Sequence, residues 1–261
     1  MLVKTQYPIL LVHGIALKDF FLFRSFGQIE KHLKDKGYDV YIGQNDAFGT
    51  IENNALQLKN QISDILLKLG TDKINIIAHS KGGLDAKYMI MHLGMEDHVA
   101  SLTTLCTPHK GSIVATKLKG LPNWMKRYVA WNLNTAYKMI GDKNPNSLEV
   151  CNQLSQNPEL DLFDKKLSTK VYCQSYSTTM QRGRNDIILV IPYKISKKYE
   201  DDFTDGLVSE KSSKFGFYMG NAFDESISHT EMVGFMTTKR KNEKVKAFYE
   251  KLCQDLAKRG F

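Results

Sequence analysis

The sequence predicts an α/β architecture, in which a mostly parallel β-sheet is covered by helices on both faces. Short apolar runs rich in β-branched residues alternate with segments of helical periodicity, and this alternation is typical of parallel strands joined by crossover helices. The chain has 261 residues, of which 42% are apolar and 25% charged, a composition typical of globular proteins. Because this length lies near the upper limit for one hydrophobic core, we expect a single domain over residues 1–261.

Five runs have the length and composition of buried strands, and helical segments separate them. The expected strands are residues 7–13, 38–42, 73–79, 99–106 and 171–176. The expected helices cover residues 26–36, 50–69 and 84–93, with a further helix near the C-terminus. Glycine follows the first two helices at positions 37 and 70, and helix ends favour this residue.

The alternation breaks over residues 113–167, where no strand-like run occurs. Within this stretch, residues 121–140 carry aromatic and large apolar side chains that are not confined to one narrow helical stripe. A helix that is apolar over much of its circumference needs cover on more than one side. We expect a helical lid above the carboxyl ends of the strands, with Trp124, Tyr128 and Trp131 in contact with substrate. An ordinary core helix is the alternative.

Ser80 stands in a sequence context that suits a nucleophile. A hydroxyl reacts poorly at neutral pH unless it is exposed and has a base beside it. Residues 78–82 read AHSKG, so Ser80 lies between small residues, directly after the strand 73–79 and just before the helix 84–93. A sharp turn between a strand and a helix exposes such a serine, and small neighbours relieve the crowding at its flanks. We therefore expect Ser80 to be a catalytic nucleophile.

Two backbone amides are expected to stabilise the negative charge that develops when a serine attacks a carbonyl group. One is the amide of Lys81, the residue after the nucleophile. The other comes from the loop after the first strand, where His13-Gly14-Ile15 follows the apolar run. Because Gly14 allows close approach of the backbone, the amide of Ile15 is the expected second donor. A simple tight turn at Gly14 is the alternative.

The base and the acid are expected late in the chain, in the order serine, acid, histidine. Of the seven histidines, His229 alone lies both after Ser80 and near the C-terminus. Asp205 lies between the two, at the head of a turn made by Gly206. Its expected role is to hold the tautomer of His229 and to stabilise the imidazolium. Four other carboxylates lack such a context: Asp186, Asp201, Asp202 and Asp224.

The order and spacing of these motifs resemble those of bacterial triacylglycerol lipases of the Pseudomonas and Burkholderia type. The resemblance rests on YPILLVHG, AHSKGG, TPHKGS, DGLVS and SHTEMV, and covers roughly residues 7–112 and 171–235. It implies an α/β-hydrolase fold with a helical lid, and activity on acyl esters at lipid interfaces. It places nucleophile, acid and base on Ser80, Asp205 and His229, and it supports Ile15 and Lys81 as the oxyanion donors.

Lipases of this type hold a calcium ion that ties the loop of the catalytic histidine to a preceding loop. The resemblance lets Glu231 and Asp186 stand for its two carboxylates. The glutamine expected six residues after the base is Phe235 here, which replaces an oxygen ligand by an apolar ring. We expect no required cofactor, with structural calcium as the weaker alternative. We expect no zinc site either, because no cluster of His and Asp has ligand spacing.

The formal charge of +8, from 36 Lys and Arg against 28 Asp and Glu, raises the question of a nucleic acid or an anionic membrane as partner. The lysines are scattered, and the densest run, from Lys239 to Lys246, is expected on the solvated face of a C-terminal helix. We therefore expect no nucleic-acid partner, with attraction to an anionic interface as the alternative. The sequence makes no prediction of the oligomeric state.

Four cysteines, Cys106, Cys151, Cys173 and Cys253, are widely spaced and form no C-x-x-C pair. We expect free thiols, with one disulfide as the alternative. No apolar stretch reaches the roughly 20 residues of a membrane-spanning helix, and no secretory signal precedes the first strand. The expected location is the cytoplasm; the mature form of a secreted protein would share these features.

The expected activity is hydrolysis of carboxylic esters, and the expected lid favours a lipase acting on acylglycerols or similar apolar esters. A carboxylesterase for short soluble esters or polyesters would use the same triad, and so would an acyltransferase. Both stay as alternatives. A non-catalytic binding protein on a hydrolase scaffold is disfavoured, because such proteins usually lose a member of the triad.

Overall fold

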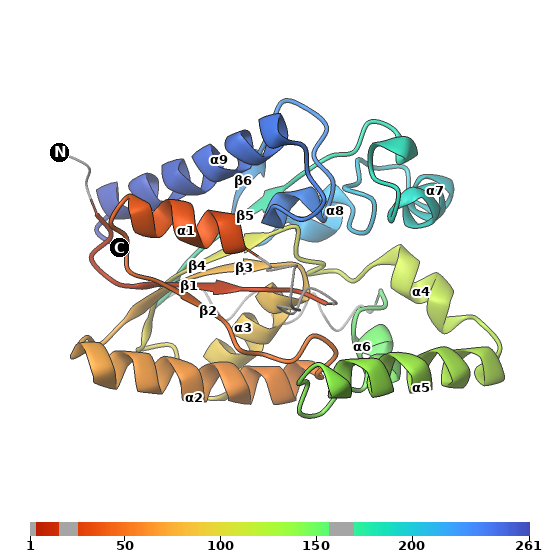
Figure 1. The fold of residues 1–261 in the computed structure, drawn as a ribbon, viewed down its shortest axis with the longest axis horizontal. Coiled ribbons are helices and arrows are strands. Elements are labelled where there is room, and N and C mark those ends of the chain that lie inside the picture. The colour runs from red at the N-terminus through yellow and green to blue at the C-terminus, as the bar shows by residue number, and fades with distance from the viewer. Residues whose placement is uncertain (1–3, 16–25, 157–169) are drawn as a thin grey trace.

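The computed structural model describes residues 4–15, 26–156 and 170–261, and it has the α/β architecture that the sequence predicts (Figure 1). Within these residues six strands form one sheet in the order β2-β1-β3-β4-β5-β6, and every neighbouring pair is parallel. The strands are β1 (Ile9–Val12), β2 (Val40–Ile42), β3 (Ile74–His79), β4 (Val99–Leu105), β5 (Tyr172–Ser177) and β6 (Phe217–Asn221).

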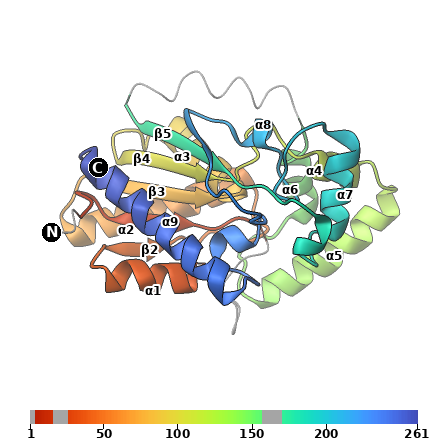
Figure 2. The same cartoon turned by 90° about the horizontal axis from the view of Figure 1, so that it is seen from above.

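Helices cover both faces of this sheet (Figure 1, Figure 2). On one face lie α1 (Gly27–Asp35) and α9 (Lys239–Lys258), and on the other lie α2 (Ile51–Leu69) and α3 (Lys81–His92). Side chains alternate along β1, so that Ile9 and Leu11 join the core under α1 and α9, whereas Leu10 and Val12 join the core over α2 and α3. The continuous apolar runs of the strands therefore reflect burial on both faces.

Helix α2 forms where its sequence signals predict. The side chain of Thr50 accepts a hydrogen bond from the amide of Asn53 at 3.3 Å and so caps the N-terminus. Its apolar stripe, which includes Leu58 and Ile62, is buried against the sheet. Gly70 ends the helix in the left-handed conformation, with φ at 64°.

The five expected strands are all present, and β6 is a sixth strand that the sequence analysis does not predict. Its side chains alternate between exposed and half-buried, so it lacks the continuous apolar run that predicts a buried strand. It is the edge strand beside β5, where one face and one edge meet solvent. Helix α7 (Val190–Tyr199) is likewise unpredicted, because it buries Ser196 alone and shows no apolar stripe.

The stretch expected to form a lid contains, within residues 113–156, the helices α4 (Ile113–Lys119), α5 (Asn123–Met139) and α6 (Ser147–Gln153). They gather with α7 at the end of the molecule opposite to both termini (Figure 1, Figure 2). The remainder of the expected lid, at residues 157–169, lies outside the described residues. All four cysteines are free, as predicted. Among the helices of the described part of the chain, none is both long and apolar enough to cross a bilayer.

Candidate active site

Ser80 occupies the turn between His79, the last residue of β3, and Lys81, the first residue of α3. Its φ is 55° and its ψ is −132°, a strained combination for a residue that carries a side chain. The Ser80 amide donates to the carbonyl of Leu105 at 2.9 Å, which ties the turn to β4. This is the strand-to-helix turn that the motif at residues 78–82 predicts.

Two glycines leave room for the turn. A Cβ on Gly82 would lie 2.5 Å from the carbonyl oxygen of His13, and a Cβ on Gly14 would lie 2.5 Å from the Cβ of Ser80. Both distances are far shorter than van der Waals contact, so the loop after β1 approaches Ser80 as closely as only glycine permits. Ile15, the next residue, lines the same cavity as Ser80.

Lys81 has separate surroundings for its backbone and its side chain. Its amide is at the N-terminus of α3, where amides have no partner within the helix and the helix dipole favours negative charge. Its buried ammonium donates to Asp85 Oδ1 at 2.6 Å, and Asn54 Nδ2 donates to Asp85 Oδ2 at 2.8 Å. Burial raises the pKa of Asp85 to about 6, and Lys81 opposes this shift. The oxyanion roles of the Ile15 and Lys81 amides stay predictions.

The structure brings Ser80, His229 and Asp205 together from three separate loops. His229 Nε2 lies 2.9 Å from Ser80 Oγ, and His229 Nδ1 lies 2.7 Å from Asp205 Oδ2. The other oxygen of Asp205 accepts hydrogen bonds from the amides of Leu207 at 2.9 Å and Val208 at 2.8 Å. All three side chains are buried. The geometry is that of a nucleophile, a base and an orienting acid, and it favours Asp205 over the four rival carboxylates.

His79 lies behind the base, and sequence reasoning assigned it only to the turn motif. The rings of His79 and His229 are tilted by 50°, with centroids 4.5 Å apart. Burial, together with the positive charge that His229 can take up, lowers the pKa of His79 well below its ordinary value. At neutral pH His79 is therefore a neutral aromatic ring in contact with the imidazole of His229.

His79, Cys106 and His229 also offer ligand atoms within 4.8 Å of one another. The three residues come from separate segments, so sequence spacing does not reveal the group. Both ring nitrogens of His229 already bond to Asp205 and Ser80, and burial raises the pKa of the Cys106 thiol well above its ordinary value. Because a metal requires thiolate and an available imidazole nitrogen, the arrangement does not fit a metal.

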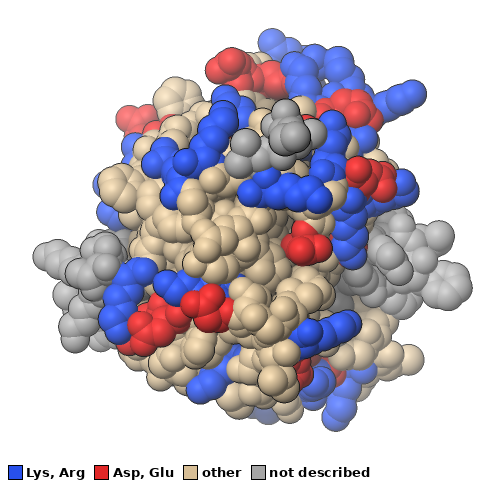
Figure 3. All heavy atoms as spheres, turned by 90° about the vertical axis from the view of Figure 1, so that its left-hand side faces the viewer, with Lys and Arg blue, Asp and Glu red and all other residues tan. Residues whose placement is uncertain are grey.

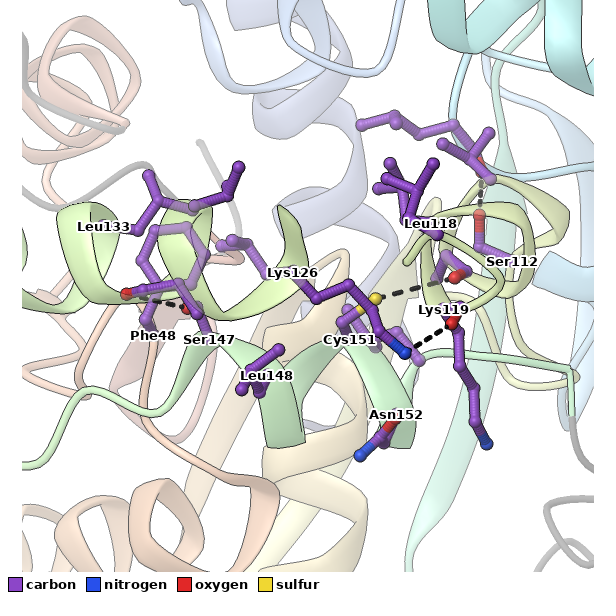
Figure 4. Close-up of a pocket in the computed structure, with 18 of the residues that line it drawn as sticks. Phe48, Ser112, Leu118, Lys119, Lys126, Leu133, Ser147, Leu148, Cys151 and Asn152 are labelled. Atoms are coloured by element: carbon purple, nitrogen blue, oxygen red, sulfur yellow. Dashed lines mark hydrogen bonds between the residues drawn. The ribbon is translucent and has the colours of Figure 1, made fainter. Parts of the chain in front are cut away.

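Ser80 and His229 line a cavity of about 560 Å³. Figure 4 shows other residues that line it. Its walls come mainly from α4, α5 and α6, and they are mostly apolar; Leu118, Leu133 and Leu148 contribute, one from each helix. Volumes of roughly 300–1,000 Å³ are usual for ligand sites. Lys119, Lys126 and Arg127 are the cationic lining residues, and no carboxylate lines the cavity among the described residues. The site therefore suits an apolar group with a reactive carbonyl at Ser80.

The structure places Trp124, Tyr128 and Trp131 outside the cavity at Ser80, so their contact with substrate stays a prediction. The three side chains are 72%, 67% and 66% exposed, and none of them lines the cavity. Their spacing puts them on one outer stripe of α5, whereas Ala130 and Leu133 on the opposite stripe line the cavity. Helix α5 is apolar on two sides, so its pattern alone does not reveal which side faces inward.

The carboxylates that stand for a calcium site are bonded to protein donors instead. Asp186 Oδ2 accepts hydrogen bonds from the hydroxyls of Ser228, at 2.7 Å, and Thr230, at 2.5 Å. Asp186 Oδ1 accepts from the backbone amides of residues 188 and 189. Ser228 and Thr230 flank the base, so Asp186 holds the His229 loop through two hydroxyls.

Glu231 is bonded just as fully. Both of its oxygens lie 2.8 Å from the ammonium of Lys241 on α9, and one also accepts from the amide of Ser228 at 2.9 Å. The side chains of Lys241 and Glu231 are only 13% and 5% exposed. The prediction that Lys241 lies on a solvated face is therefore wrong, because its long aliphatic stem carries the ammonium inward. Phe235 is half-buried and packs against the core under α9. These residues therefore do not fit calcium.

Comparisons with known proteins identify the family of the chain. The model of a family described as alpha/beta hydrolase fold matches residues 7–182. The chain is 29% identical over 266 residues to triacylglycerol lipase 2 of Saccharomyces cerevisiae, which covers 89% of this chain and 73% of that protein. It is 32% identical over 138 residues to the triacylglycerol lipase of Pseudomonas fragi, which covers 52% of this chain and 46% of that protein.

Among solved structures, a metagenomic carboxyl esterase superposes with a TM-score of 0.75 at 16% identity, covering 97% of this chain and 76% of that one. At this identity the likeness is one of fold alone. The match to a Pseudomonas lipase confirms the resemblance expected from the motifs, although this chain spans less than half of that relative.

Proposed function

The chain belongs to the alpha/beta hydrolase fold family, and from this premise we propose that it is a serine hydrolase that cleaves carboxylic esters of apolar acids. The observation that carries the proposal is the chain of hydrogen bonds from Asp205 through His229 to Ser80, at 2.7 and 2.9 Å, at the mouth of an apolar cavity. Relatives named triacylglycerol lipases and a structural neighbour named as an esterase support the ester as the bond that is cleaved.

The first half-reaction forms an acyl-enzyme. Ser80 Oγ attacks the ester carbonyl carbon while its proton passes to His229 Nε2. Asp205 keeps the proton of Nδ1 in place and stabilises the imidazolium. The carbonyl oxygen becomes an oxyanion that accepts from the amides of Ile15 and Lys81. The carbon–oxygen bond of the ester then breaks, and the alcohol leaves with the proton from His229.

The second half-reaction releases the acid. A water gives its proton to His229 Nε2 and attacks the acyl carbon, and the bond to Ser80 Oγ breaks as that oxygen regains the proton. None of these steps requires a metal or a cofactor, and we propose that the chain needs neither. The hydroxyls and the ammonium that hold Asp186 and Glu231 support this proposal.

We further propose a lipase rather than an esterase for short soluble esters. The support is the size and apolar lining of the cavity, which extends from Ser80 between α4, α5 and α6. A long acyl chain would fill it, whereas a short one would leave apolar wall in contact with water. An acyltransferase with the same triad is the second candidate, and it predicts ester products when an acceptor alcohol competes with water.

The test is hydrolysis of a series of glycerol and p-nitrophenyl esters from short to long acyl chains, with and without a calcium chelator. We expect kcat/KM to rise with chain length, to be unchanged by the chelator, and to vanish in Ser80→Ala. If kcat/KM were highest for the shortest ester, the lipase proposal would be refuted and an esterase for short soluble esters would be supported. Folded protein that neither hydrolyses any ester nor is labelled at Ser80 by a fluorophosphonate would refute the hydrolase itself.

A further inference from the structure

The outer side of α5 is aromatic where solvent-facing helices are ordinarily polar. We call Trp124, Tyr128 and Trp131 the outer stripe; they follow one another at intervals of four and three residues, and all are exposed. Ala130 is the one buried residue of α5. Three large aromatic side chains in one exposed row are unusual for a surface that meets only water.

Further apolar side chains are exposed at the same end of the molecule. Leu118, Leu121 and Val129 are exposed and also line the cavity, so the cavity opens beside the outer stripe. On α7, which lies at this end in both ribbon views, Ile191 is exposed, as are Ile187 and Ile188 just before it. The Lys117 ammonium lies 3.7 Å from the ring centroid of Tyr199, which joins α4 to α7.

The charged side chains within α4, α5 and α7 have one sign. Residues 113–139 contain no Asp or Glu, and their cations are Lys117, Lys119, Lys126, Arg127 and Lys138. Helix α7 likewise contains no carboxylate, and it carries Lys194, Lys197 and Lys198. Carboxylates border these helices: Asp186 is buried and bonded, Glu149 on α6 is exposed, and residues 200–202, directly after α7, are Glu-Asp-Asp. The opposite end of the molecule differs, because acidic and basic groups are interspersed there (Figure 3).

We propose that this end, which we call the docking face (α4, α5 and α7), binds the surface of an anionic lipid layer. The outer stripe would enter the headgroup region, where Trp and Tyr are favoured, while the cations meet lipid phosphates. Helix α5 then lies in the plane of the layer, and the cavity mouth opens onto it. Delivery of an ester to Ser80 rests on the proposed function, whereas docking itself does not.

The charge of the face favours lipid over a second copy of the chain. Two docking faces pressed together would oppose cation to cation, which costs free energy unless counter-charges intervene. An anionic layer supplies such charges at every position of the face. Each Lys or Arg near such a surface strengthens binding by about fivefold.

The chain carries its own probe of docking, because its two tryptophans, Trp124 and Trp131, are both in the outer stripe. The experiment uses Ser80→Ala, so that no lipid is cleaved, with vesicles of phosphatidylcholine alone or of phosphatidylcholine and phosphatidylglycerol in equal parts. We expect cosedimentation and a blue shift of tryptophan emission with the anionic vesicles, both reduced by salt. Little of either is expected with the neutral vesicles.

Variants in the same Ser80→Ala background separate the two contributions. Arg127→Gln with Lys138→Gln should weaken binding to anionic vesicles by about 25-fold. Trp124→Ser with Trp131→Ser should abolish detectable cosedimentation. The matched controls lie toward the other end: Lys68→Gln with Lys251→Gln for charge, and Leu67→Ser, whose side chain is 85% exposed, for apolar area. The controls should bind as Ser80→Ala does.

Three outcomes would overturn the inference: no binding to either vesicle, equal binding to both, or equal loss in the controls. Self-association abolished by Trp124→Ser with Trp131→Ser would assign the face to a second copy instead. Because binding is read without turnover, a chain that docks but cleaves no ester would refute the proposed function and leave this inference intact.

Discussion

The catalytic edge of the sheet and the helical cover above it are built differently. At the edge, Ser80, Asp205 and His229 are at most 7% exposed, and each is held by backbone or side-chain hydrogen bonds. In the cover, which is α4, α5 and α6, helix α5 buries only Ala130 over its 17 residues. By contrast, α2 buries seven of its 19 residues. Close packing and hydrogen bonds fix the positions of the residues at the edge. The helices of the cover instead expose most of their side chains to the cavity or to solvent.

This difference predicts that substitutions at the edge reduce the cleavage of all esters alike, whereas substitutions in the cover discriminate between esters. The largest effect should come from the triad. Ser80→Ala and His229→Ala should lower kcat by about 10⁴–10⁶-fold, and Asp205→Asn by about 10⁴-fold, on short and long esters equally. Thermal unfolding and kinetics on both ester classes would measure this.

His98→Ala, at an exposed histidine, is the control for the triad variants and should keep full activity. A triad variant that lost activity on long esters but kept it on short ones would contradict the separation of edge from cover.

The next effect should come from the approach of the first loop to the nucleophile. Gly14→Ala adds a Cβ 2.5 Å from that of Ser80, so the loop must move and the amide of Ile15 with it. We expect kcat to fall by about 10²-fold on every ester, the loss typical for one oxyanion donor. Gly120→Ala is the control, because its nearest neighbour would be 3.3 Å away and its φ of −73° suits alanine. Equal losses in both variants would refute the close-approach argument.

A smaller effect is expected from the ion pair that holds the histidine loop. Lys241→Met leaves Glu231 buried without its cation, which costs about 3 kcal/mol of stability. It should lower kcat by about tenfold with KM unchanged, since His229 is less well placed. Lys241→Arg should retain activity, and Lys246→Ala, which removes a more exposed pair with Glu243, should be neutral.

Added calcium tests whether a metal could replace the Lys241 ammonium in holding the His229 loop. If calcium restored Lys241→Met to full activity, the carboxylates of Glu231 and Asp186 would be able to hold a metal. We expect no restoration, because Asp186 remains bonded to two hydroxyls and two amides.

The smallest effect, and the one specific to the cover, is expected at Cys151 on α6, which lines the cavity. Cys151→Phe fills part of the space for an acyl chain, so kcat/KM should fall by about fivefold on long esters and stay unchanged on short ones. Cys151→Ser keeps the volume and should leave the chain-length profile unchanged. A uniform loss with Cys151→Phe would indicate a distorted edge rather than a narrowed cavity.

The sequence predicts most of the fold and the catalytic edge for a physical reason. A strand buried on both faces, such as β3, needs a continuous apolar run, and the turn at Ser80 needs small neighbours. Both requirements concern residues that are neighbours in the chain, so the amino-acid sequence shows them directly. The positions of Asp205 and His229 follow from the order of the motifs.

What the sequence does not predict depends on contacts between distant segments. Lys241 lies in a run of cations that suits a solvated helix, and only the arrival of Glu231 beneath α9 draws its ammonium inward. The contact between the tilted rings of His79, at the end of β3, and His229 likewise joins distant segments. Helix α5 has apolar residues on two sides, so its sequence does not indicate which side faces inward. The cavity determines this, and the cavity forms only when distant segments come together.

The bond between His229 and Ser80 joins residues that are 149 positions apart, and this separation has a consequence during synthesis. A ribosome adds about 5–20 residues each second, so the serine is made roughly 7–30 s before the histidine. Throughout that interval the hydroxyl has no base and is inert. The growing polypeptide is thus incapable of acylating itself on any ester it meets, and reactivity begins only when the distant imidazole has been delivered and folded into place.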